Sequence, residues 1–211
     1  MKRYYRYLTI AALAAIVAGC MEFLAINHPE TAPVNTGVDA TFGVKIEVNK
    51  DIDIRTTPVV AILAPTAWKM AENAVVTYTT SDGSGTKEMR LAVGTDQEPK
   101  TKGPWSAALK SRLGLKGNYE SVEWVAFIAT TDHNWGPNDQ FTGTVTVRFT
   151  TGSENLKTNL AYFIGNTQDG VHDDAQYYLL HEQPFETTGG SNATIDYTLP
   201  KMCSISPEAF T

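Results

Sequence analysis

The stretch Phe141-Thr-Gly-Thr-Val-Thr-Val-Arg-Phe149 decides the fold class of this chain. Apolar side chains at Phe141, Val145, Val147 and Phe149 alternate with polar ones. Side chains of a β-strand point to opposite faces in turn, so this period of two is typical of a strand with one buried face. The stretch therefore predicts a half-buried β-strand.

Strand patterns recur on both sides of this stretch. Residues 40–48 alternate between apolar and polar side chains, whereas residues 59–63 form an apolar run between two prolines that is typical of a strand buried on both faces. Residues 74–80 and 87–93 flank the turn cluster at 81–85 and are predicted to form a hairpin. Further strands are predicted at 122–128, 160–164, 177–180 and 195–199.

One short helix interrupts the strands. Residues 107–113 are predicted to be helical, with Ser106 as the N-terminal cap and Gly114 at the C-terminal end. Roughly eight to ten short strands separated by turn residues, with a single helix, favour two packed layers of sheet. We therefore predict a mainly β protein, a two-sheet immunoglobulin-like β-sandwich with one short helix, formed by residues 37–200.

The first 19 residues have the features of a secretion signal. Three basic residues precede an apolar stretch, residues 8–17, which is too short for a membrane span of about 20 residues. The stretch ends in Val17-Ala-Gly-Cys20, which resembles the bacterial lipobox. This resemblance implies cleavage before Cys20 and its acylation with chains such as palmitate. The alternative is an ordinary secretory signal in which Cys20 happens to follow Ala-Gly.

The segments that flank the predicted sandwich have no clear period. Residues 20–36 are interpreted as a lipidated tether, or as a tether that supplies a first edge strand before Pro29. Residues 201–211 are interpreted as a tail or as the start of a further domain.

The charge of the chain excludes one class of partner. Its 17 Lys and Arg against 23 Asp and Glu give a formal charge of -6, and removal of the three basic residues within 1–19 lowers this to -9. Nucleic-acid binding needs a basic surface that neutralises phosphates. We therefore expect no nucleic-acid partner, and we expect the lipid rather than a basic patch to hold the protein on the membrane.

The sequence offers little for catalysis. It contains no Gly-x-Ser-x-Gly, P-loop, His-Glu-x-x-His or Cys-x-x-Cys motif. Glu120 and Glu123 would point to opposite faces of a strand, which weakens them as a glycosidase pair. The acidic loops 132–139 and 169–174 offer oxygen donors for calcium, but such residues also fill ordinary turns. We expect no enzyme activity, no bound metal and no cofactor.

The tryptophans suggest where a ligand would bind. Trp124 lies within an apolar strand and is predicted to be a core residue. Trp105 and Trp135 lie beside Gly and Pro in polar surroundings, where an indole ring can stack on a sugar or on a partner surface. The alternative is that both rings fold inward over the core. The predicted ligand-binding residues are Trp105, Trp135, Asp132, Asn134 and Asp139.

Several motifs carry a family resemblance. The lipobox, the short Pro-containing tether and the runs 59–70, 73–80 and 163–174 resemble uncharacterised Bacteroidetes cell-envelope lipoproteins with a domain of unknown function. The genes of such proteins often lie beside SusC/SusD-like glycan-uptake systems. The resemblance implies a β-rich envelope protein and no catalytic residues, and its members are longer than this chain.

These observations lead to one functional hypothesis and one alternative. We expect a lipid-anchored protein of the bacterial cell envelope, at the outer membrane, that binds a polysaccharide as an accessory of a SusC/SusD-like uptake system. The alternative is a structural or adhesive, fimbrillin-like subunit whose exposed strand edges bind other protein chains.

Overall fold

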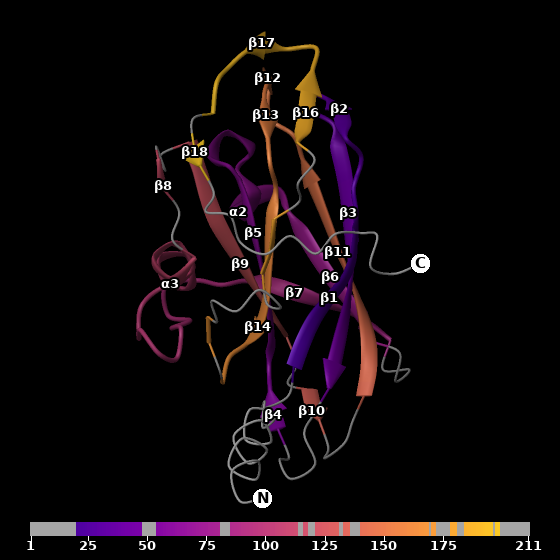
Figure 1. Ribbon diagram of the computed structural model, residues 1–211, viewed down its shortest axis with the longest axis vertical. Helices are drawn as coiled ribbons and strands as arrows, with labels where there is room; N and C mark the ends of the chain where they lie inside the picture. The colour runs from indigo at the N-terminus through magenta and orange to yellow at the C-terminus, as the bar shows by residue number, and fades with distance from the viewer. Residues whose placement is uncertain are drawn as a thin grey trace, which may run out of the picture.

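The computed structural model describes residues 20–47, 54–80, 85–113, 116–117, 121–130, 133–135, 140–168, 170–171, 178–180, 184–195 and 197–198 (Figure 1). Its strands are β1 Cys20–Asn27, β2 Thr31–Pro33, β3 Gly37–Glu47, β4 Ile54–Thr56, β5 Pro58–Pro65, β6 Val75–Thr80, β7 Thr86–Leu91, β8 Lys116–Gly117, β9 Val122–Ala129, β10 His133–Trp135, β11 Gln140–Thr150, β12 Glu154–Asn155, β13 Lys157–Thr158, β14 Ala161–Asn166, β15 Tyr178–Leu180, β16 Phe185–Thr188, β17 Ser191–Asn192 and β18 Tyr197–Thr198. The helices are the 3-10 turn η1 Thr66–Trp68, the single turn α2 Met70–Asn73 and α3 Trp105–Arg112.

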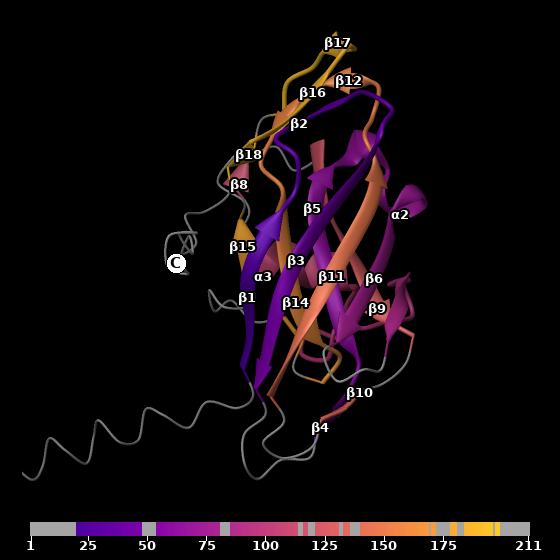
Figure 2. The same cartoon turned by 90° about the vertical axis from the view of Figure 1, so that its right-hand side faces the viewer.

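Nine strands form one antiparallel sheet in the order β1-β3-β11-β6-β7-β9-β5-β14-β15. The sheet curls until its two halves face each other as layers (Figure 2). Phe42 of β3 and Tyr162 of β14 show the contact between the layers, because their ring centroids lie 5.3 Å apart although the two strands are distant in the sheet order. The predicted mainly β, sandwich-like fold is confirmed, with one curled sheet in place of two separate sheets.

The burial of each strand follows its sequence pattern. In β11, Val145, Val147 and Phe149 are buried, whereas Thr144 and Arg148 are exposed. β5 lies between β9 and β14, and its apolar run is buried on both faces as predicted. The predicted hairpin is confirmed by the antiparallel pairing of β6 with β7.

The segment interpreted as a tether belongs to the fold in the part that the structure describes. β1 begins at Cys20 and pairs antiparallel with β3, which confirms the alternative of a first edge strand before Pro29. β2 follows and pairs parallel with β16.

The predicted helix start is also corrected: α3 begins at Trp105 with Pro104 as the N-cap residue, and no side chain caps it, so Ser106 lies inside the helix.

A small cap closes one end of the sandwich, where Figure 1 shows β2, β12, β13, β16 and β17 together. Its three-stranded sheet has the order β13-β16-β2. Aromatic rings join the cap to the sandwich: Trp68 stacks on Phe149 at 5.5 Å between ring centroids, and its ring meets the edge of Phe185 of β16 at 5.4 Å. Such ring pairs stabilise a core beyond the effect of buried area alone.

Buried polar groups complete the junction between cap and sandwich. The Thr151 hydroxyl donates a hydrogen bond to the Pro33 carbonyl (2.9 Å) and accepts one from the Thr36 amide (3.0 Å). The Thr187 hydroxyl accepts a hydrogen bond from the Leu156 amide (2.7 Å). Because buried polar groups are costly when unpaired, these bonds fix the path of the chain at this end.

Among the described residues, no helix is both long and apolar enough to cross a membrane.

We expect Phe185→Ala to lower the free energy of unfolding by about 3–5 kcal/mol, because it opens a cavity between the cap and the sandwich. Phe185 has 0% exposure, whereas the control, Val75→Ala, truncates a side chain that is 52% exposed. Urea unfolding followed by circular dichroism measures both. A loss below about 0.5 kcal/mol for Phe185→Ala, the range of ordinary surface changes, would contradict a packed junction.

Candidate functional site

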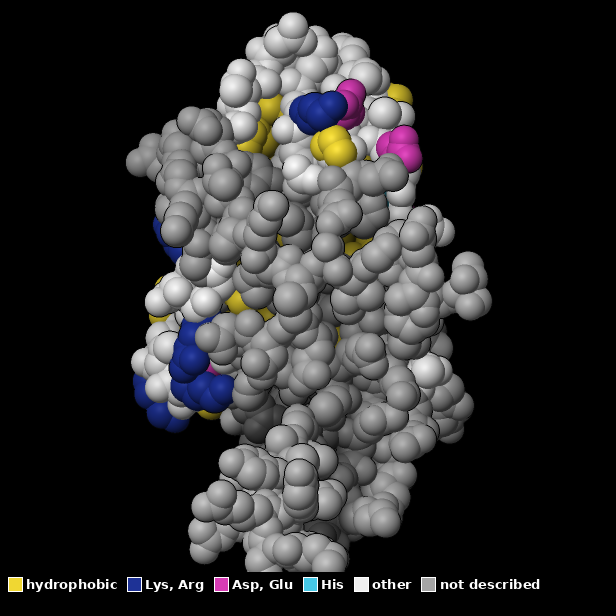
Figure 3. All heavy atoms as spheres, in the orientation of Figure 1, with side chains coloured by type: hydrophobic (Ala, Val, Ile, Leu, Met, Phe, Trp, Pro, Cys, Tyr) yellow, Lys and Arg dark blue, Asp and Glu magenta, His cyan; other side chains and the backbone are white. Residues whose placement is uncertain are grey.

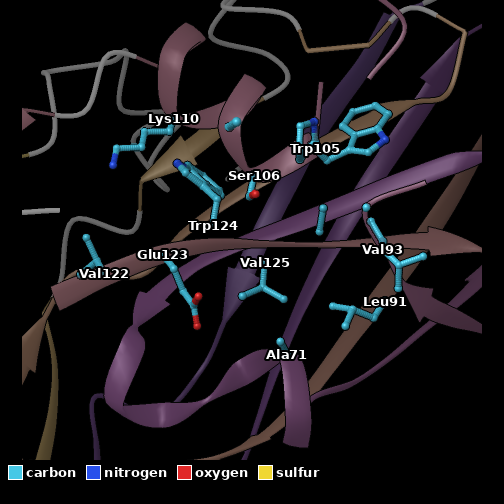
Figure 4. A pocket seen from close by; sticks show the side chains of 15 residues that line it. Ala71, Leu91, Val93, Trp105, Ser106, Lys110, Val122, Glu123, Trp124 and Val125 are labelled. Atoms are coloured by element: carbon cyan, nitrogen blue, oxygen red, sulfur yellow. The ribbon is translucent and has the colours of Figure 1, made fainter. Parts of the chain in front are cut away.

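A cleft of about 500 Å³ opens beside α3 (Figure 4). Its walls come from the end of β7 and the loop after it (residues 91–94), the start of α3 (104–107 with Lys110), the first half of β9 (122–126) and Ala71 of α2. In Figure 4, Trp124 points from β9 toward α3, whereas Glu123 and Val125 point from the other face of the strand toward Ala71. The cleft therefore lies along one edge of β9.

Unequal strand pairing creates this cleft. β5 pairs with β9 along Val122–Ile128, but β7 pairs with it only along Phe127–Ala129. Beyond Leu91 the chain turns away, after the Ala92 amide has donated a hydrogen bond to the Ala126 carbonyl (2.8 Å). The first half of β9 therefore borders the cleft where β7 would otherwise continue the sheet.

Trp105 forms a wall of the cleft. It opens α3 and is buried together with Ala108 and Leu109, which lie on the same helix face because residues three and four apart are neighbours on a helix. Trp105 is 2% exposed, so neither face of its ring is open for stacking in this conformation. This burial agrees with the packing alternative, and a role of Trp105 in binding stays a prediction. Trp124 is buried as predicted.

Polar groups accompany the apolar wall. Burial, and to a smaller extent the charge of Glu72 on α2, raise the pKa of Glu123 above its ordinary value. Ser106 and Lys110 are exposed on α3 at the cleft. The sequence did not predict that Glu72 and Glu123 lie close enough to interact, because only the fold brings α2 next to β9. Glu120 lies outside the described residues.

The rim of the cleft is braced on its β7 side. Two parallel hydrogen bonds join the Arg90 guanidinium to the Asp96 carboxylate, at 2.6 and 2.7 Å. The same carboxylate accepts a hydrogen bond from the Val93 amide (2.9 Å). Both interactions, with that of Arg90 the larger, lower the pKa of Asp96 against the effect of burial. The backbone at Val93 is thus held in place before any ligand arrives.

A buried carboxylate braces the other part of the same loop. Glu98 is 1% exposed, and its Oε2 accepts hydrogen bonds from the amides of Lys100 (3.1 Å) and Thr101 (2.6 Å). Its Oε1 accepts one from the Val171 amide (3.0 Å). A Cβ atom added at Gly170 would lie 1.9 Å from Oε1, so this approach requires glycine there. Nothing in the sequence pattern predicts this anchor.

Basic side chains surround α3. Lys100, Lys102, Lys110 and Arg112 are exposed, and Figure 3 shows Lys and Arg side chains gathered on the side where Figure 1 places α3. This local positive charge contrasts with the net negative charge of the chain. It favours the approach of anionic rather than cationic ligands to this side.

Two further predicted site residues, Asn134 and Trp135, lie elsewhere. Asn134 and Trp135 belong to β10, which pairs with β4 (Ile54–Thr56), and both views place β10 far from α3 (Figures 1 and 2). The structure therefore does not bring Trp105 and Trp135 together. Asp132 and Asp139 lie outside the described residues, as does most of the acidic loop 169–174. Among the described residues, no three His, Cys, Asp or Glu side chains form a group suited to a metal ion.

The residues that carry the family resemblance have structural roles. Asn73 receives a hydrogen bond at Oδ1 from the Thr150 amide (3.0 Å) and donates one to the Trp68 carbonyl, which ties α2 to η1 and β11. Asn166 accepts a hydrogen bond from the Gln168 amide (2.9 Å) at the end of β14. Asn73 and Asn166 therefore stabilise the fold at these two places.

Comparison with known proteins gives a family and a few distant structures. The model of a family described as "Domain of unknown function (DUF4961)" matches residues 21–201. No curated protein matches the sequence.

Solved structures show weak similarity. AvmM, which catalyses macrocyclization in alchivemycin A biosynthesis, has 11% identity over 83% of this chain and 91% of its own, with a TM-score of 0.38. A cohesin module from a family 33 glycoside hydrolase of Clostridium perfringens has 9% identity over 83% and 100%, with a TM-score of 0.30. BcpA, the major pilin subunit of Bacillus cereus, has 13% identity over 80% and 40%, with a TM-score of 0.28. No functional argument rests on likenesses this weak.

Glu98 is expected to make the stability of the protein depend on pH. Burial by itself raises its pKa, but the hydrogen bonds from Thr101, Val171 and Lys100 outweigh it and hold the pKa below the ordinary 4.5. The ionised group therefore stabilises the fold above pH 4.5, and this contribution is lost as the pH falls through the lowered value.

We expect Glu98→Gln to lower the free energy of unfolding at pH 7 by about 1–3 kcal/mol, because an amide cannot accept all three hydrogen bonds. The difference from wild type should shrink at pH 3, as urea unfolding at the two pH values will show. Glu88→Gln, at an exposed position of β7, is the control for the change of charge. An equal loss for Glu98→Gln at both pH values would refute the ionic anchor.

Proposed function

We propose that this chain, which belongs to the DUF4961 family, is a cell-envelope protein that is anchored by lipid at Cys20 and binds glycan in the cleft beside α3. The anchor is inferred from the lipobox resemblance at residues 17–20. Several acyl chains on one cysteine hold a protein stably, because each buried methylene contributes about 0.8 kcal/mol. Delivery of the glycan to a SusC/SusD-like partner at the outer membrane is the setting that the sequence resemblance implies.

The observation that supports glycan binding is the composition of the cleft. Its volume of about 500 Å³ is within the range of small-ligand sites. Leu91 and Val93 offer an apolar surface for the C–H face of a sugar, and Val93 is already 52% exposed. Glu123, Ser106 and Lys110 offer acceptors and donors for hydroxyl groups. The braced loop 92–104 reduces the entropy that ordering the rim would cost on binding.

The basic surroundings narrow the choice of glycan. Lys110 lines the cleft, Arg112 belongs to the same helix, and Lys100 and Lys102 lie in the loop that leads into α3; all four are exposed. A polysaccharide that carries carboxylates, such as one with uronic acids, gains from this charge more than a neutral polysaccharide does. Acidic polysaccharides are therefore the first ligands to test.

A second candidate function rests on the edge of the nine-stranded sheet. β1 is the last strand at one end of the strand order and, among the described strands, pairs with β3 alone. An extended peptide from another protein could pair with this edge, as in strand addition. This arrangement would suit a structural or adhesive subunit.

The anchor predicts a specific labelling result. We expect the full chain, produced in a bacterium that processes lipoproteins, to incorporate labelled palmitate and to fractionate with membranes. Cys20→Ser should abolish both, because the acyl acceptor is lost. Cys203→Ser changes the other cysteine and serves as the control, with label and membrane fraction retained. Incorporation that survives Cys20→Ser would refute the anchor.

The glycan hypothesis predicts saturable binding that depends on Glu123. The chain from residue 20 onward is titrated by calorimetry with uronate-containing and neutral polysaccharides. We expect Glu123→Gln to weaken binding about tenfold or more, since a hydrogen bond to a charged group contributes about 1.5–3 kcal/mol. The pKa of Glu123 is raised, so acidification protonates this carboxylate at a higher pH than an ordinary glutamate. We therefore expect the affinity to fall earlier as the pH is lowered.

Glu88→Gln, outside the cleft, is the matched control and should bind like wild type. Trp135→Ala tests the residues predicted on β10, and retained affinity would assign the site to the cleft. Absence of binding to every polysaccharide by folded protein would refute the glycan hypothesis and favour strand addition.

A further inference from the structure

The predicted acylation site and the first strand of the fold share one residue. β1 begins at Cys20, which pairs with Glu47 of β3, and Glu47 pairs in turn with Gln140 of β11. Cys20 therefore lies at the end of the sandwich where β3 stops and β11 starts. No residue of the described chain separates Cys20 from the sheet, so the fold leaves no spacer between the acyl chains and the domain.

The same end carries β4 and β10. Both views show these two strands at the lower end of the molecule, where β1 and β11 begin (Figures 1 and 2). The end of β14 belongs to it as well, because Asn166 pairs with Pro58, which follows β4 after one residue. The cap, with β12, β16 and β17, lies at the opposite end.

Resting on the anchor at Cys20 proposed above, we infer that the bilayer lies directly against the end of the sandwich that carries Cys20, β4 and β10, and that the cap points away from it. A flexible tether of 15 residues would let the domain move about 20 Å from the membrane and turn freely. An anchor at the first residue of a paired strand allows neither this displacement from the membrane nor free rotation of the domain. The partner of this end is thus the headgroup surface of a phospholipid bilayer.

This orientation bears on where a glycan can bind. Asn134 and Trp135 of β10 lie at the membrane-facing end, so a long polysaccharide would meet the bilayer before it reached them. Figure 1 shows α3 on the flank of the sandwich and the cap at the far end, and the cleft opens beside α3. Both stay accessible from the aqueous side. The inferred orientation therefore favours the cleft over the β10 residues as the glycan site.

Energy transfer from a labelled residue to acceptor lipids tests the orientation. Gln168, next to the end of β14, and Asn192 of β17 are both exposed and mark the two ends. β11 alone, with 11 residues, spans about 35 Å between the ends. The full chain with Cys203→Ser and either Gln168→Cys or Asn192→Cys is labelled with a donor dye, after intact mass has verified acylation, and is reconstituted in phosphatidylcholine vesicles that contain a headgroup acceptor.

We expect strong transfer from position 168 and weak transfer from position 192. A 15-residue Gly/Ser insertion after Cys20 should reduce the transfer from position 168, since it restores a spacer. Equal transfer from the two positions, stronger transfer from position 192, or transfer from position 168 that the insertion leaves unchanged would overturn the inference.

Failure of the anchor is distinguishable from failure of the orientation. An unacylated mass would remove the premise and refute the lipid anchor together with the orientation. Acylated protein with equal transfer from both positions would refute the orientation alone. Glycan binding in the cleft is measured separately, on chain without lipid, and does not depend on either result.

Discussion

β7 and β9 pair at only three positions, Met89–Leu91 with Phe127–Ala129, and this short ladder joins the two layers of the sandwich. On one side of it lie β1, β3, β11 and β6, and on the other β5, β14 and β15. The ladder is where the curled sheet passes from one layer to the next. Its shortness also leaves the first half of β9 without β7 as a neighbour. The closure of the sandwich and the cleft beside α3 therefore have the same physical origin.

Loops that border the cleft depend on fixed polar contacts rather than on apolar packing. Asp96 and Glu98 lie two residues apart, yet Asp96 binds the Arg90 guanidinium, whereas Glu98 accepts hydrogen bonds from backbone amides of two separate segments, at Thr101 and at Val171. Buried or half-buried carboxylates are tolerated when charged or backbone donors surround them. The cap is held differently, by aromatic rings and buried threonine hydroxyls. The two regions should consequently respond to different perturbations, acid for the loop and loss of volume for the cap.

The sequence predicted those parts of the fold that obey a local rule. β3, β5, β9 and β11 were predictable because burial of one or both faces repeats along the strand itself. The curl of the sheet was not predictable, because it depends on which strands pair with each other. The pairing of β7 with β9 over three positions produces no periodic pattern in the sequence. Glu98 was missed for the same reason: its partner Val171 is distant in the chain, and a glutamate between Gln97 and Pro99 resembles any exposed loop residue. For the site, Trp105 lines the cleft, but it is buried within α3, which starts two residues before the predicted helix start at residue 107.

Gly170 and Glu98 are in such close contact that only a glycine at one position and a glutamate at the other fit together. Any Cβ at position 170 would fall within 1.9 Å of the carboxylate, and a shorter acid at position 98 would no longer reach all three amides. Gly170 also has a φ of +70°, a conformation that side chains disfavour. Substitution of either residue alone would therefore disrupt the conformation of the loop. Across the family, the two positions are therefore expected to change together or not at all, and this linkage would mark the homologues that keep the braced rim.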